Sequence, residues 1–202
     1  MKMTGRISEK NFKNNLINHL KTFECGWEDG DKKPGKANKK TADVINCSLQ
    51  VAIEIKDDGN FSDSLGRNFS KALEIRGMNR QLRELLRDSS KKFNNYPNYR
   101  SLVLFRTDKA DWPWAFLESA IYGVQDSQEK HGYKFPSSIF TDNNGSIKHI
   151  GGILFYGRKH SFFIKNINPN ISKGRRISYE WIKVYFPGTK EIIPNKIPRE
   201  YQ

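Results

Sequence analysis

Two short runs rich in valine and isoleucine, residues 42–47 and 51–56, stand on either side of a brief polar break. Branched aliphatic residues favour strands, and two such runs with a short connection are typical of a β-hairpin. Charged residues interrupt both runs, Asp43 in the first and Glu54 and Lys56 in the second. The sequence therefore predicts a hairpin whose apolar strands carry a few charged side chains.

The alternation of side chains along a strand predicts which face of the hairpin carries these charged residues. Successive side chains point to opposite faces, so Glu54 and Lys56 share one face while the apolar residues between them share the other. If the hairpin closes with an even-numbered loop, Asp43 faces Glu54 or Lys56 on that same side, whereas a slip of one residue sends it to the other face. The favoured register gathers two carboxylates and one ammonium in a small patch.

Such a patch suits phosphodiester hydrolysis. Mg²⁺ prefers carboxylate ligands and keeps several waters, and a neighbouring lysine can orient or deprotonate an attacking water. The alternative is that these are solvated charges on an edge hairpin. Against it, residues 51–55 are nearly continuous in apolar character, which indicates a central strand buried on both faces.

Ten residues separate Asp43 from Glu54, and one residue separates Glu54 from Lys56. This spacing resembles that of the PD-(D/E)xK nuclease superfamily, which includes restriction endonucleases and Holliday junction resolvases. Ala42 stands where many members have proline. The resemblance implies a Mg²⁺ cofactor, with Mn²⁺ able to substitute, held by Asp43, Glu54 and the carbonyl of Ile55. It also implies that Lys56 activates water, that DNA is the substrate and that the protein acts as a homodimer.

A helix is expected over residues 8–23, with Ser8 as its N-cap. Its apolar stripe consists of Phe12, Leu16, Leu20 and Phe23. Glu9 falls inside this stripe, and a buried carboxylate needs a partner. The resemblance assigns a first-helix glutamate to the metal site, so Glu9 is a catalytic candidate. The alternative is a solvated glutamate that interacts with the helix dipole.

A short strand is expected over residues 23–28, followed by a polar loop over residues 29–40. The loop carries five lysines, Lys32, Lys33, Lys36, Lys39 and Lys40. Because it ends just before Asp43, it is predicted to form a flap that grips DNA phosphates over the site. A mobile hairpin tip is the alternative.

After a turn, residues 62–92 are expected to be helical with a phase shift near Gly77, and residues 99–106 to form a strand. A strand, a helix and another strand make a crossover unit, so the strands at 51–56 and 99–106 should be parallel neighbours. Gln81 matches a substrate-positioning glutamine of several members of the resembled family, although a structural role is the alternative. The order helix, strand, strand, strand, helix, strand is the common core of that family and covers about half of the chain.

The second half is predicted to be β-rich, with a helix first, a loop-rich stretch, three strands and an extended tail. These segments are residues 112–124, 125–150, 152–156, 161–165, 177–186 and 187–202. Arg158 and Lys159, in the turn between the first two strands, are nucleic-acid-binding candidates. Lys173, Arg175 and Arg176 in the next connection are further basic turn residues and are expected to contact nucleic acid. The aromatic residues of these strands are expected in the core.

Composition limits the functional classes. There are 35 Lys and Arg against 22 Asp and Glu, a net charge of +13, which predicts a polyanionic partner such as nucleic acid. The alternative is a generally soluble basic surface, because the positive charge is spread widely along the chain. Cys25 and Cys47 are too few for a disulfide framework and are expected to be buried thiols. No apolar run could span a bilayer or form a secretory signal, which favours a cytoplasmic, intracellular protein with no membrane partner.

We therefore expect one domain over residues 1–202, with a nuclease core at about 6–106 and a C-terminal elaboration at about 107–202. The expected fold is α/β, a restriction-endonuclease-like mixed central sheet flanked by helices, with a β-rich C-terminal extension. The expected function is Mg²⁺-dependent DNA endonuclease activity. Two alternatives stay open, a catalytically inert nucleic-acid-binding module of the same fold and a ribonuclease.

Overall fold

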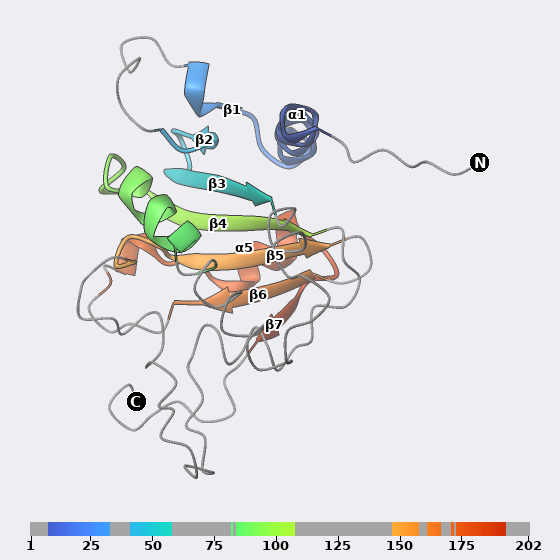
Figure 1. Cartoon of the computed structure of the whole chain (residues 1–202). Coiled ribbons are helices and arrows are strands. Elements are labelled where there is room, and N and C mark those ends of the chain that lie inside the picture. The colour runs from blue at the N-terminus through green and yellow to red at the C-terminus, as the bar shows by residue number, and fades with distance from the viewer. Residues whose placement is uncertain are drawn as a thin grey trace, which may run out of the picture.

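A computed structural model of the chain describes residues 8–32, 41–57, 82, 84–107, 147–157, 161–166, 171 and 173–192 (Figure 1). These residues form a mixed α/β fold around one seven-stranded sheet. The strands are β1 (Trp27–Asp29), β2 (Val44–Asn46), β3 (Val51–Asp57), β4 (Arg100–Thr107), β5 (Gly152–Gly157), β6 (Ser161–Lys165) and β7 (Lys190–Ile192). The described helices are α1 (Glu9–Lys21), α5 (Tyr179–Tyr185) and a helix that includes residues 84–93, with short 3₁₀ turns η1 (Gly30–Lys32) and η4 (Lys173–Arg175).

The strands lie side by side in the order in which they occur along the chain. β1, β2 and β3 form an antiparallel meander, and β3, β4 and β5 are parallel to one another. β6 is antiparallel to β5, and β7 is parallel to β6. The predicted parallel pairing of the second hairpin strand with the strand near residue 100 is confirmed.

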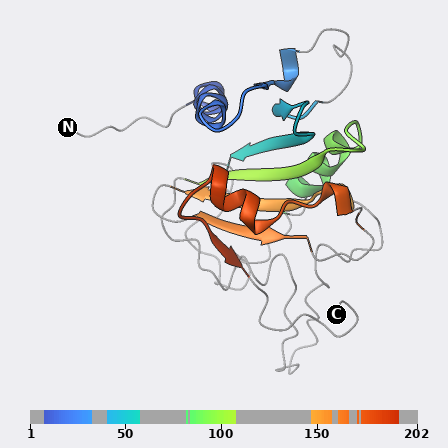
Figure 2. The ribbon, with the colours of Figure 1, turned by 180° about the vertical axis from the view of Figure 1, so that it is seen from behind.

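Apolar cores cover both faces of the sheet. On one face, Leu82, Leu86 and Phe93 pack against Ala52 and other strand residues. Residues of α1 and α5 form the core on the other face. The two opposite views of Figures 1 and 2 show α5 on the side of the sheet away from helix 84–93. Because β3 lies between β2 and β4 and residues 51–55 are buried, the prediction of a central strand is confirmed.

Helix α1 begins as predicted, since the Ser8 side chain accepts a hydrogen bond from the Asn11 N–H at 3.3 Å. Leu16, Ile17 and Leu20 are its buried residues. The helix ends at Lys21, and Phe23, which the predicted stripe included, lies beyond it with 43% of its surface exposed. The first strand is also displaced, to Trp27–Asp29.

The prediction of a strand over residues 177–186 is wrong, because this segment contains α5. Ser178 caps the helix by accepting from the Trp181 N–H, and Ile182 and Tyr185 are its buried residues, three positions apart. Aromatic residues favour strands, but the cap and the helical spacing prevail here. The tail prediction is wrong in part, because residues 190–192 form β7.

Two further expectations are corrected. Cys25 and Cys47 are both exposed rather than buried, since each lies at an end of the short β1–β2 ladder where little covers it. Arg175 is buried rather than available to DNA, and its Nη1 donates to the carbonyl of Phe93 at 3.4 Å. The expected aromatic core is confirmed at Phe155 and Phe163, which are buried.

Candidate metal centre

Hairpin register brings the two acidic candidates together. Four residues separate β2 from β3, and Val44 pairs with Ile53, so one further step along the ladder sets Asp43 opposite Glu54. Side chains that face each other across a ladder share one face of the sheet. The predicted register is confirmed, and both carboxylates lie on the face covered by helix 84–93.

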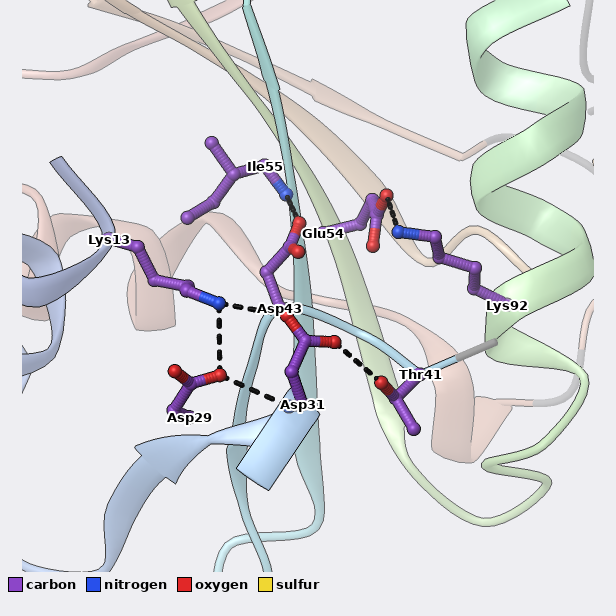
Figure 3. A network of polar contacts seen from close by, with 8 residues as sticks. All are labelled: Lys13, Asp29, Asp31, Thr41, Asp43, Glu54, Ile55 and Lys92. Carbon is purple, nitrogen blue, oxygen red and sulfur yellow. Dashed lines mark hydrogen bonds and ion pairs between the residues drawn. The ribbon is translucent and has the colours of Figure 1, made fainter. Parts of the chain in front are cut away.

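Glu54 is the most deeply buried charge of this group. Its side chain is 1% exposed, and two ammonium groups reach the same carboxylate oxygen. Lys56 Nζ lies 2.8 Å and Lys92 Nζ 2.6 Å from Oε1, as ion pairs rather than well-aligned hydrogen bonds. The buried Oε2 has no hydrogen-bond donor among the described residues. Figure 3 shows Lys92 approaching Glu54 from the helix.

Backbone contacts hold Asp43 in place. It is 8% exposed, and its Oδ2 accepts a hydrogen bond from the Ile55 N–H at 2.7 Å (Figure 3). Because the N–H and C=O of a strand residue point to the same side, the carbonyl of Ile55 also faces the edge where Asp43 lies. The Gly30 N–H donates to the Asp43 carbonyl at 3.0 Å, which ties η1 to the start of β2.

Burial and nearby charges shift the pKa values of Glu54 and Lys92. The pKa of Glu54 is raised to about 7, first because burial disfavours the charged form and then because Asp43 repels it; Lys56 and Lys92 act in the opposite direction. Burial alone would lower the pKa of Lys92, but Glu54, Asp43 and Asp31 outweigh it and raise that pKa. The carboxylates and Lys92 therefore form one electrostatic unit.

A second polar network borders the first. Lys13 of α1 lies 2.9 Å from both Asp29 Oδ1 and Asp31 Oδ2, and the Thr41 hydroxyl donates to Asp31 Oδ1 at 2.8 Å (Figure 3). Burial would raise the pKa of Asp31, but hydrogen bonds from Lys13 and Thr41, with the charges of Lys13 and Lys92, lower it. This network joins α1 and η1 to the chain that leads into Asp43.

Sequence reasoning did not identify Lys13, Asp29, Asp31 or Lys92 as parts of this region. Lys92 was placed at the end of a predicted helix, and only the arrangement of that helix over β3 directs it to Glu54. A signal for Lys13 was present, because it lies one turn after Glu9 on the same predicted helix.

The remaining candidates divide into two groups. Glu9 is exposed in the first turn of α1, so its expected burial is wrong. This position agrees with the alternative, a solvated glutamate that interacts with the helix dipole. Lys32 is exposed in η1. The other nucleic-acid-binding candidates lie outside the described residues; they are Lys33, Lys36, Lys39, Lys40, Gln81, Arg158 and Lys159. The same holds for the predicted helix over residues 112–124.

The donor set fits a hard cation in part. Across the described ranges, no group of three or more His, Cys, Asp or Glu side chains is arranged to hold a metal. Asp43 and Glu54 nevertheless lie opposite each other on adjacent strands, and the buried Oε2 of Glu54, which has no hydrogen-bond donor among the described residues, is an acceptor that a cation would satisfy. Oxygen ligands of this kind suit Mg²⁺, which takes its remaining ligands from water or substrate phosphate.

Comparisons with known proteins do not add to this picture: no family model, curated protein or solved structure matches the chain. Within the part of the chain that the structure describes, none of the helices has the length and apolar character to cross a membrane.

Proposed function

We propose that this chain is a Mg²⁺-dependent DNA endonuclease that uses a PD-(D/E)xK-type site. The observation that carries the proposal is the pairing of Asp43 with Glu54 on adjacent strands. It sets the buried carboxylate of Glu54, whose Oε2 has no hydrogen-bond donor among the described residues, next to a second carboxylate. Lysine ammonium groups lie beside Glu54.

In this proposal Asp43, Glu54 Oε2 and the Ile55 carbonyl hold the cation, for which Mn²⁺ substitutes. The ion supplies charge stabilisation at the scissile phosphate and lowers the pKa of water. Lys56 lies on the same face as Glu54 with 16% of its side chain exposed, so its ammonium can contact both the carboxylate and an incoming water. Lys56 Nζ orients the attacking water, and Asp43 is kept in register by the Ile55 N–H.

Charge supports a nucleic-acid substrate. The net charge of +13 attracts a phosphate backbone, and Lys32 lies exposed in η1, directly after β1 and close along the chain to the site. The order helix, three antiparallel strands, helix, parallel strand agrees with a restriction-endonuclease-like fold, which we propose on this basis. A homodimer stays a prediction of the resemblance.

A specific observation favours a second candidate, a nucleic-acid-binding module without turnover. Two ammonium groups, Lys56 and Lys92, already lie on Glu54 without a divalent ion. A site that needs no metal for its stability can persist after catalysis is lost.

A cleavage assay separates these candidates. Supercoiled, linear, branched and single-stranded DNA, together with RNA, are incubated with Mg²⁺, Mn²⁺ or EDTA. We expect metal-dependent cutting of DNA that falls about 100-fold or more in Asp43→Asn, Glu54→Gln and Lys56→Met. Lys183→Met is the matched control, because Lys183 lies on α5 across the sheet and pairs with Glu180 at 2.6 Å.

Full cutting by Glu54→Gln and Lys56→Met would refute the site assignment. Binding of DNA with a steep salt dependence but no cutting of any substrate would establish the binding module instead. Cutting of RNA alone would make the protein a ribonuclease.

A further inference from the structure

Lys92 lies where the negative charge of the candidate centre is concentrated. Its Nζ is 2.6 Å from Glu54 Oε1, and Asp43 and Asp31 also act on it electrostatically. Lys92 therefore contacts the Glu54 carboxylate directly, and the charges of Asp43 and Asp31 also favour its ammonium form. The same negative charge would attract a divalent cation.

Lys92 differs from Lys56 in how it reaches Glu54. Lys56 follows Glu54 by two positions on β3, so strand alternation alone keeps the two side chains together. Lys92 comes from helix 84–93, with its backbone anchored next to the buried Phe93. Its side chain is 24% exposed, so a rotation of its flexible stem can carry the ammonium into solvent while the helix stays packed.

We propose that Lys92 is an internal cation that neutralises the Asp43–Glu54 pair in the metal-free protein and is displaced when a divalent ion binds. This inference rests on the proposed metal site. A divalent ion and an ammonium group against the same carboxylate repel each other, so the two compete for Glu54. Lys92 thereby lowers the metal affinity of the site and stabilises the fold when metal is absent.

The first test is metal binding without substrate. Calorimetric titration with Mn²⁺ compares the wild type with Lys92→Met, which keeps the apolar stem and removes the charge. We expect Lys92→Met to bind Mn²⁺ about ten-fold tighter. We also expect it to melt at a lower temperature than the wild type without metal and to regain that difference when Mn²⁺ is added.

Lys91→Met is the matched control, since Lys91 is the preceding residue on the helix, is 67% exposed and pairs with Asp88 instead. It should bind Mn²⁺ as the wild type does. Equal or weaker Mn²⁺ affinity in Lys92→Met than in the wild type would overturn the proposal.

A second test uses the wild type alone and does not depend on the folding of a variant. An amine-reactive reagent is applied with and without saturating Mn²⁺, and labelling of each lysine is measured by peptide mass spectrometry. Displacement predicts faster labelling of Lys92 in Mn²⁺ and unchanged labelling of Lys91. Unchanged labelling of Lys92 would also overturn the proposal.

These results are independent of the cleavage assay. Tighter Mn²⁺ binding by Lys92→Met, in a protein that cuts no nucleic acid, would support the role of Lys92 and refute the nuclease. Metal-dependent cutting by the wild type, with unchanged Mn²⁺ affinity in Lys92→Met, would support the nuclease and refute the role of Lys92.

Discussion

Glu54 shows how a single side chain can be unfavourable for folding and useful for binding. Burial raises its pKa to about 7, and the nearby charge of Asp43 adds to the shift. Near neutral pH the carboxyl group is therefore divided between its two protonation states. A cation that binds the charged form must compete with a proton, so metal affinity should increase as the pH rises through this range.

The stability of the metal-free protein should report the same shift. A carboxyl whose pKa is raised by folding binds its proton more tightly in the native state, so its contribution to stability is fully present below the ordinary value of 4.5 and is lost as pH rises through about 7. For Glu54 the loss is about 3 kcal/mol. Glu54→Gln cannot ionise and should lack this dependence.

Urea unfolding at pH 5, 6, 7 and 8 in EDTA measures the pH-dependent contribution of Glu54 to stability. The free energy of unfolding of Glu54→Gln minus that of the wild type should grow with pH. Glu180→Gln is the control, because Glu180 has 76% of its side chain exposed. Parallel pH curves for the wild type and Glu54→Gln would show that Glu54 is not shifted.

Among the elements, the short turn η1 helps to position Asp43. Gly30 donates its N–H to the Asp43 carbonyl. Lys13 of α1 forms ion pairs with Asp29 and Asp31, the residues before and after Gly30. A Cβ on Gly30 would overlap the carbonyl oxygen of Ala42. Glycine is required here because two backbones approach closely.

Gly30→Ala should therefore displace η1 from the start of β2 and move Asp43. We expect a loss of about 2 kcal/mol in the free energy of unfolding, with weaker Mn²⁺ binding. Gly188→Ala provides a comparison, since Gly188 has a φ of 82° but open space around its Cβ position. That variant should lose about 1 kcal/mol through backbone strain alone.

Unfolding curves of Gly30→Ala and Gly188→Ala measure the two losses in free energy of unfolding, and Mn²⁺ titrations of both variants measure the change in metal binding. If Gly30→Ala binds Mn²⁺ as tightly as Gly188→Ala does, then η1 does not position Asp43.

In the molecule as a whole, the sheet joins the two halves of the chain. β5, β6 and β7 continue the sheet beyond β4, and Ala52 from the first half shares a core with Ile164 from the second. The C-terminal strands are thus part of the structure that supports β3.

The net charge of +13 leads to a prediction about DNA affinity. If about six phosphates are contacted, affinity should fall about 10³-fold between 50 and 200 mM salt. Fluorescence anisotropy with labelled duplex DNA in EDTA measures binding without cleavage. An affinity that is independent of salt would exclude phosphate neutralisation as its source.

Interactions between neighbouring residues were sufficient to predict the β2–β3 hairpin and the start of α1. The branched aliphatic residues of β3 and the two-residue repeat of strands predicted that Asp43 would face Glu54 or Lys56 if the loop had an even number of residues. The observed loop has four residues and sets Asp43 opposite Glu54. Ser8 predicted the start of α1 for the same reason, because a cap involves only neighbouring residues.

Contacts between distant elements could not be predicted in this way. Lys92 meets Glu54, and Lys13 meets Asp29 and Asp31, only because a helix packs over each face of the sheet at a particular position. Residues 179–185 carry side chains compatible with either strand or helix; Ser178 caps the helix, and its buried residues share a core with residues of α1. Local patterns determine which way neighbouring side chains point, whereas packing determines which distant side chains meet. The free energy of packing between distant elements exists only once the whole core has formed.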